Sequence, residues 1–235
     1  MQAIRWERIE EFVGYGSVDV RVLFLGIEEG LARDDSLEDD LLVRSAFHRT
    51  ADLYEAQLAL GGPGKHFGDN PVTQRTWRPM CHLMLRRDGC ERPTREKRLR
   101  YQADRLGRAG GETLLAELLP YPNPNTADWL YASCTKYKTR EVYDEQMVPR
   151  RTRLLREVLS QGCFEIVVAY GNGFWGRYKL LFDGADWTHE GPFETACVRG
   201  TRVVLAPHFA QRAFNTDEQL NAFADVALGV SSPAR

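Results

Sequence analysis

The chain has 235 residues, of which 43% are hydrophobic and 27% charged, and its formal net charge is -2. This length and balance are typical of one globular domain and exclude a largely disordered chain. No apolar run approaches the roughly 20 residues that a bilayer crossing needs, so we expect no membrane contact. The charged N-terminal segment argues against an export signal, and the expected location is the cytoplasm.

The cysteines and histidines of the sequence do not form a metal-binding pattern. Five cysteines, at positions 81, 90, 134, 163 and 197, include no C-x-x-C pair. An odd number without ligand spacing favours reduced thiols over disulfides or a zinc site, although a Cys81–Cys90 pair stays open. The histidines show no H-x-x-x-H pattern. The sequence therefore predicts no metal and no cofactor.

In the first half of the chain, a strand signal precedes a helix signal and a long irregular segment. Residues 18–25 (VDVRVLFL) predict a strand that becomes fully apolar toward its end. Ser36 and Asp39 resemble a capping box, and the helix they begin is expected to run to the glycines at 61 and 62. Residues 61–93 are rich in Gly, Pro and Arg and predict an irregular excursion. We expect residues 31–110 to be a helical or irregular insertion.

The second half of the chain carries further strand and helix signals. In chain order they are the strand 113–119, the proline-rich loop 120–124, a basic helix including Leu154 to Leu159, the strand 164–170, a hairpin of 195–198 with 202–205, and a final helix from Thr216 with Gln219 in the capping-box position. Helix followed by strand indicates parallel crossovers. The expected fold class is a three-layer α/β/α domain over residues 1–235, with a central, mainly parallel sheet of four to five strands.

Three of the predicted strands end in polar or proline-rich turns. These turns are residues 26–30 (GIEEG), 120–124 (PYPNP) and 206–209 (APHF). In parallel α/β sheets, ligands bind beyond the carboxyl ends of the strands, so we expect the three turns to converge on one cleft. Together with the strand that ends in VVAYG, this ordered set of motifs resembles the uracil-DNA glycosylase superfamily. The first turn of that family looks like GQDPYH, GEAPG or GINPG, and its final turn reads HPS.

The resemblance implies a nucleobase-recognising protein that hydrolyses the N-glycosidic bond of a damaged base in DNA, such as uracil. Glu28 stands at the turn position where the family has a catalytic Asp or an Asn, and His208 stands at the histidine of the final turn. A carboxylate there would stabilise an oxocarbenium-like transition state and orient water. A histidine there would donate a hydrogen bond to the departing base.

Further residues are expected to bind the substrate around this pair. They come from the same turns, from the second strand and from nearby aromatic positions: Gly26, Ile27, Glu29, Gly30, Glu117, Pro120, Tyr121, Phe47 and Phe209. The family often has an Asn that reads the base edge on the second strand, and the nearest position here is Glu117. An aromatic ring must also stack on an extruded base, and Phe47, Phe67 and Tyr121 are the candidates.

The same residues also have purely structural interpretations, which the sequence leaves open. Glu28 and Glu29 stand near a helix start, where acidic residues interact favourably with the helix dipole. His208 follows a proline at a strand end, where its ring can simply hydrogen-bond a neighbouring carbonyl. Glu117 can equally face solvent at the margin of the sheet.

Any contact with DNA must come from local basic surfaces, because the whole chain is slightly acidic. Residues 92–108 hold seven basic against two acidic side chains, and residues 136–156 hold seven against three. If these segments bind nucleic acid, neutralising Arg95, Arg98 or Arg151 should weaken a salt-sensitive association. Solvated helix faces are the alternative interpretation. A non-catalytic module that binds nucleic acid or a small ligand in the same cleft is the rival function.

A third possibility is a dinucleotide-dependent enzyme centred on Gly171–Gly176 (GNGFWG), which fits the pattern G-x-G-x-x-G. Bulky Phe174 and Trp175 occupy the phosphate turn. A dinucleotide-binding unit normally continues into a parallel strand that ends in an acidic residue about 20 positions later, and the equivalent stretch here is the Trp- and Gly-rich DGADWTHEGPFE. A plain strand-to-helix turn is therefore the preferred interpretation. The sequence makes no prediction about the oligomeric state.

Overall fold

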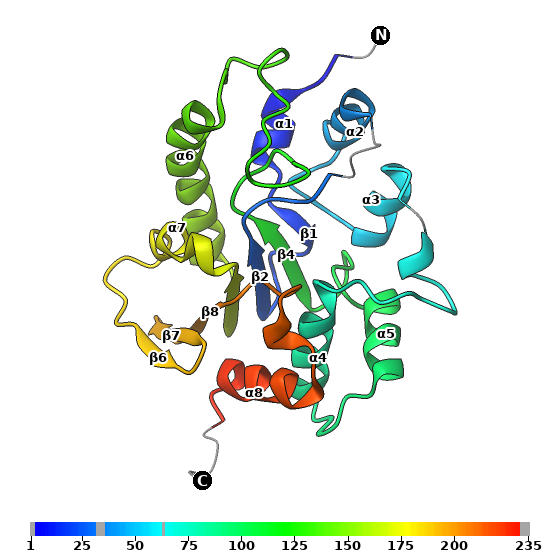
Figure 1. Ribbon diagram of the computed structural model, residues 1–235, viewed down its shortest axis with the longest axis vertical. Helices are drawn as coiled ribbons and strands as arrows, with labels where there is room; N and C mark the ends of the chain where they lie inside the picture. The colour runs from blue at the N-terminus through cyan, green and yellow to red at the C-terminus, as the bar shows by residue number, and fades with distance from the viewer. Residues whose placement is uncertain (1–2, 32–35, 63, 231–235) are drawn as a thin grey trace.

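Eight strands form one sheet in the part of the chain that the computed structural model describes, residues 3–31, 36–62 and 64–230 (Figure 1). Their order across the sheet is β3-β1-β4-β2-β5-β8-β7-β6. The strands are β1 (Gly14–Gly16), β2 (Val22–Gly26), β3 (Thr50–Ala51), β4 (Thr113–Glu117), β5 (Ile166–Tyr170), β6 (Thr188–Glu190), β7 (Phe193–Val198) and β8 (Thr201–Ala206).

The centre of the sheet is parallel and its margins are mixed. Strands β4, β2, β5 and β8 pair in parallel, whereas β1 is antiparallel to β4 and β7 is antiparallel to both β8 and β6. The predicted α/β class is confirmed, but the prediction of four to five strands is wrong because the sheet is larger. The additional strands β1, β3 and β6 have only two or three residues, too few to produce an alternating pattern in the sequence.

Helices cover both faces of the sheet. The α-helices of the described residues are α1 (Trp6–Glu11), α2 (Leu37–Arg44), α3 (Leu53–Ala59), α4 (Trp77–Arg87), α5 (Arg95–Asp104), α6 (Arg140–Gln161), α7 (Trp175–Lys179) and α8 (Asp217–Leu228). Short 3₁₀ helices are η1 (Gly64–His66), η2 (Asn172–Phe174) and η3 (Arg212–Phe214).

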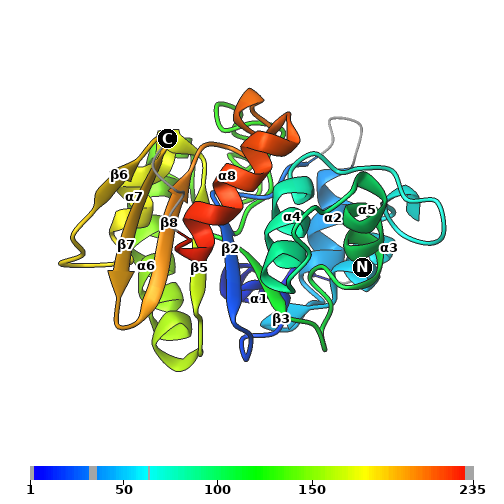
Figure 2. The same ribbon diagram turned by 90° about the horizontal axis from the view of Figure 1, so that it is seen from below.

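Alternating strand residues build one hydrophobic core on each face. On β2, Leu23 and Leu25 pack with residues of α1, α2, α6 and α7, whereas Val22 and Phe24 pack with residues of α3, α4, α5 and α8. Figure 2 shows the sheet with α6 and α7 toward one side and α4 and α5 toward the other. The layered arrangement expected from the sequence is therefore present.

The helix expected from Ser36 to the glycines at 61 and 62 is in fact two helices. Ser36 caps α2 as expected, accepting a hydrogen bond from the Asp39 amide. The chain then leaves the helix to form β3, and Asp52 begins α3 by accepting hydrogen bonds from two amides of its first turn. A second capping residue inside the expected helix was the signal for this break.

Other local predictions are confirmed with shifted boundaries. The hairpin of β7 and β8 turns at Arg199 and Gly200, which both have positive φ, and α8 begins with a capping box between Thr216 and Gln219. Helix α4 lies within residues 61–93, where only an irregular segment was expected.

All five cysteines are free thiols. In the described part of the chain, no helix is both long enough and apolar enough to cross a membrane.

Candidate functional site

A cavity of about 470 Å³ opens at the carboxyl ends of the parallel strands, and its walls include both Glu28 and His208. This size is within the range of small-ligand sites. Residues from all three predicted turns and from β1, β4, β5, η1, η2, α3 and α4 line it: Tyr15, Ile27, Glu28, Glu29, Gly30, Leu53, Gln57, His66, Gln74, Thr76, Trp77, Leu115, Glu117, Asn123, Pro124, Asn125, Thr126, Tyr170, Phe174 and His208. We call this cavity the cleft.

Two of the predicted turns run side by side along the cleft. Beyond β2 and β4, the Leu119 amide donates to the Ile27 carbonyl at 2.7 Å. The Asn123 amide then donates to the Glu29 carbonyl at 3.1 Å, and Gly30 and Asn123 form an isolated parallel bridge. Backbone pairing between the two turns therefore resumes beyond Pro120 and Pro122.

Glu28 is held in place by the first residue of α6. Its Oε2 lies 2.8 Å from Nη2 of Arg140, and only 4% of its side chain is exposed. Arg140 also pairs with Asp144, which in turn pairs with Arg177 at 2.6 Å. Burial raises the pKa of Glu28, and Arg140 opposes that rise. The carboxylate is thus fixed in one orientation at the wall of the cleft.

Glu29 holds the first turn in place through hydrogen bonds to neighbouring elements. Its Oε2 accepts hydrogen bonds from the Tyr15 hydroxyl and from Nη1 of Arg44, both at 2.6 Å. Arg44 in turn binds Asp40 one helical turn earlier on α2. These contacts tie the turn to β1 and α2, so Glu29 lines the cleft as part of a network.

Glu117, the last residue of β4, is a buried carboxyl group at the floor of the cleft. Its Oε1 accepts a hydrogen bond from the Tyr170 hydroxyl at 3.4 Å, while its buried Oε2 has no hydrogen-bond partner among the described residues. Burial, followed by repulsion from Glu29 and Glu28, raises the pKa of Glu117 well above its ordinary value. This raised pKa favours the protonated form of the carboxyl group, which can both donate and accept a hydrogen bond.

Gly26 makes room for the Glu117 carboxyl group. A Cβ atom at position 26 would lie only 2.1 Å from Oε2 of Glu117. We therefore expect Gly26→Ala to displace Glu117 and to lower the free energy of unfolding by about 1–3 kcal/mol. Urea denaturation measures this change. Gly30→Ala is the matched control, because nothing lies within 4 Å of a Cβ at position 30; equal effects of the two variants would contradict the prediction.

His208 presents a neutral imidazole to the cleft. Its Nδ1 accepts a hydrogen bond from the Ala210 amide at 3.2 Å, which places the ring proton on Nε2. Burial lowers the pKa of His208, which favours this neutral form at pH 7. The ring contacts Tyr170 edge-on, with 5.8 Å between the centroids. His208 can thus offer an N–H donor to a ligand.

Several expected substrate-binding residues lie outside the walls of the cleft. The Tyr121 ring packs among tyrosines on the α6 face, and its hydroxyl donates to Glu10. Phe47 packs against Phe12, and Phe209 stacks on Tyr170 with 4.5 Å between the centroids. Gly26, Pro120 and the buried Phe67 are also not wall residues.

The structure brings other residues into the cleft that the sequence interpretation missed. Asn123 is 2% exposed, and its Oδ1 has no hydrogen-bond partner among the described residues. The half-buried rings of Trp77 and Phe174 also line the cleft. The position of Asn123 between two prolines, in a loop already assigned to the site, could have identified it as a site residue from the sequence. No sequence signal distinguished the two rings from core aromatics.

The segment Gly171–Gly176 forms the preferred strand-to-helix turn. Gly171 has φ +119° directly after β5, and the chain continues into η2 and the five-residue helix α7. Phe174 from this turn contributes to the wall of the cleft. The segment thus contributes to the same site as Glu28 and His208.

Two of the three arginines expected on a basic surface are buried. Arg151 is 0% exposed and donates to the backbone carbonyls of Glu10, Glu117 and Leu118. Arg98 is 7% exposed, and Arg95 is exposed. The prediction that Arg151 belongs to a nucleic-acid surface is wrong, because its guanidinium satisfies carbonyls at the end of β4.

Comparisons with known proteins assign no family to this chain. No protein-family model matches the sequence, and a search of curated proteins finds no significant match. Within residues 3–31, 36–62 and 64–230, no three His, Cys, Asp or Glu side chains are grouped to hold a metal ion.

Proposed function

We propose that this protein is a nucleobase-recognising glycosylase of the uracil-DNA glycosylase type, which hydrolyses the N-glycosidic bond of a damaged base. The observation that carries the proposal is that Glu28 and His208, from turns far apart in the sequence, line one cleft. The two turns follow β2 and β8, which lie on either side of β5 in the parallel part of the sheet. Ligand sites of α/β proteins occupy this edge of the sheet.

The two side chains suit the two charges that develop during the reaction. As the bond between sugar and base breaks, positive charge grows on the sugar, and the Glu28 carboxylate stabilises it. Negative charge grows on the departing base, and the Nε2–H of His208 donates to it. Arg140 keeps Glu28 oriented before the substrate arrives, so no reorganisation accompanies the step.

Glu117 and Asn123 suit the recognition of a base edge. Each has a buried oxygen without a hydrogen-bond partner among the described residues. A protonated Glu117 offers a donor and an acceptor side by side, which complements a base edge that presents a C=O next to an N–H, as uracil does. Buried groups of this kind discriminate strongly, because a wrong base leaves them unpaired. Among the rings that line the cleft, Phe174 and Trp77 are half-buried and suited to stacking on a base, whereas Tyr15 and Tyr170 are buried.

The test is release of uracil from labelled single- and double-stranded oligonucleotides, measured as alkali-sensitive abasic product. We expect product from the wild type and a rate at least about 100-fold lower for Glu28→Gln, because the charge that stabilises the sugar cation is removed. Glu145→Gln is the matched control, since Glu145 is exposed on α6 outside the cleft. Absence of product from the wild type on both substrates contradicts the proposal.

A second candidate function is binding of a nucleobase without hydrolysis. The ion pair between Glu28 and Arg140 favours it, because a carboxylate neutralised by a guanidinium stabilises a cation less well. This candidate predicts that the wild type binds a uracil-containing strand, gives no abasic product and loses affinity in Asn123→Ala. Fluorescence anisotropy alongside the product assay distinguishes the two functions.

A further inference from the structure

A second cavity, of about 210 Å³, is lined by three arginines and by no acidic residue. Its walls are Thr73, Arg78, Arg95, Arg98, Leu99 and Gln102, from α4, α5 and the segment before α4. We call it the arginine cavity. Asp217, at the start of α8, is the carboxylate that pairs with two of these arginines, at 3.0 Å from Arg98 and 3.6 Å from Arg78. The positive charge around the cavity therefore exceeds the negative charge.

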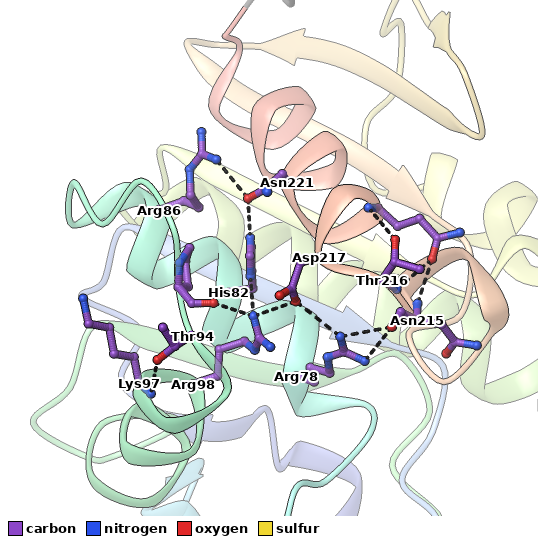
Figure 3. A network of polar contacts seen from close by, with 12 residues as sticks. Arg78, His82, Arg86, Thr94, Lys97, Arg98, Asn215, Thr216, Asp217 and Asn221 are labelled. Carbon is purple, nitrogen blue, oxygen red and sulfur yellow. Dashed lines mark hydrogen bonds and ion pairs between the residues drawn. The ribbon is translucent and has the colours of Figure 1, made fainter.

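The Arg98 guanidinium is held through one of its three nitrogen atoms, Nη1. Figure 3 shows its guanidinium reaching both Asp217 and the His82 ring. Its contacts with these two residues and with the Pro93 carbonyl all use Nη1. No hydrogen bond with a described residue engages Nε or Nη2. A guanidinium that is 7% exposed and lines a cavity with two unused nitrogens is preorganised for an anion.

The neighbouring groups add donors. Burial lowers the pKa of His82 to about 4, so at neutral pH its Nδ1 accepts from Arg98 and does not repel it. Arg78 donates both terminal nitrogens to the Asn215 carbonyl, each at 3.2 Å. Arg95 is exposed and has no ion-pair or hydrogen-bond partner among the described residues. The cavity thus combines fixed and free guanidinium groups.

The arginine cavity and the cleft share one wall. Thr73 lines the arginine cavity, whereas the next residue, Gln74, lines the cleft. Gln102, which lines the arginine cavity, holds this wall in place. Its Oε1 accepts a hydrogen bond from the Gln74 amide. Its Nε2 donates to the carbonyls of Val72 and His66. Consecutive Cα atoms are about 3.8 Å apart. The two cavities are therefore neighbours across residues 73 and 74.

We propose that the arginine cavity binds a backbone phosphate of the nucleic-acid strand whose base occupies the cleft. Guanidinium groups bind phosphate oxygens through paired, charge-assisted hydrogen bonds. The inference rests on the proposed function for its substrate class, but it concerns binding and not base release. It also explains how a chain of net charge -2 can hold a polyanion.

The test compares Arg95→Gln with Arg100→Gln. Arg95 lines the arginine cavity, whereas Arg100 is exposed on the same helix and pairs with Asp104. The probe is a fluorescein-labelled single-stranded oligonucleotide of 12 nucleotides, titrated by anisotropy at several salt concentrations. We expect Arg95→Gln to weaken binding several-fold and to reduce the slope of log affinity against log salt by about 0.7, the contribution of one single-strand phosphate contact. Arg100→Gln should behave like the wild type.

A second arm identifies the source of the phosphate group. Inorganic phosphate, added at constant ionic strength, should displace the oligonucleotide from the wild type and have less effect on Arg95→Gln. Equal salt slopes for the two variants would overturn the proposal. It is also overturned if phosphate raises the melting temperature of the wild type without displacing the strand, because the site would then hold free phosphate. Abasic product is scored separately, so failure here leaves the glycosylase proposal standing.

Discussion

Replacing Arg151 with methionine is expected to lower the free energy of unfolding by about 3–5 kcal/mol. The guanidinium is fully buried and donates to three backbone carbonyls, at 2.8 Å to Glu117, 3.0 Å to Leu118 and 2.9 Å to Glu10. Burial lowers the pKa of Arg151 to about 10, so the group is still charged at pH 7. Methionine fills much of the space but leaves three buried acceptors without a donor. Urea denaturation followed by circular dichroism measures the loss.

The matched control for this change is Arg153→Met. Arg153 lies on the same helix and is exposed, so its replacement should change the free energy of unfolding by no more than about 0.5 kcal/mol. A loss below 1 kcal/mol in Arg151→Met would mean that water or a shifted backbone satisfies the carbonyls. Because Arg151 holds the carbonyl of Glu117, its loss should also disturb the floor of the cleft.

Replacing His208 with alanine is expected to lower the rate of base release by about 10²–10³-fold. The proposed role of the ring is to donate its Nε2 proton to the departing base, and no other described histidine except His66 lines the cleft. The single-turnover rate measures the chemical step directly. The substitution removes one hydrogen bond to the ring, from the Ala210 amide, so we expect little change in stability.

Two further variants separate a donor role from a packing role for His208. His208→Gln retains an N–H donor and should recover part of the rate, whereas a purely structural role would not favour glutamine over alanine. His48→Ala is the control, because His48 is exposed and outside the cleft. Equal rates for the wild type and His208→Ala would remove His208 from the mechanism.

The sequence predicted the central strands because they are long and apolar. The segments now seen as β2, β4, β5 and β8 carry enough buried side chains to be found by pattern alone. The short strands β1 and β3 were missed, since their pairing depends on contacts between distant segments. In β1, the Cβ position of Gly14 would lie 1.9 Å from the Leu115 carbonyl oxygen, a close approach that only the folded sheet makes visible.

The site was predictable where it follows from strand ends and unpredictable where it depends on packing. The shared position of Glu28 and His208 in the cleft was predictable because the carboxyl ends of parallel strands share one edge of the sheet. The expected ring Tyr121 belongs instead to the core, and Phe174 faces the cleft. Likewise, a run of basic residues gives no sign that Arg151 is buried, because the charge pattern does not show which helix face meets the sheet.

The two outer margins of the sheet are very short, with two residues in β3 and three in β6. An exposed strand margin offers free amides and carbonyls to which another chain can add. Strands β3 and β6 expose too few unpaired backbone groups to pair with a new strand, and β6 also carries charged Glu190. Addition of strands between molecules is therefore disfavoured, which would help to keep a large mixed sheet from aggregating at high concentration.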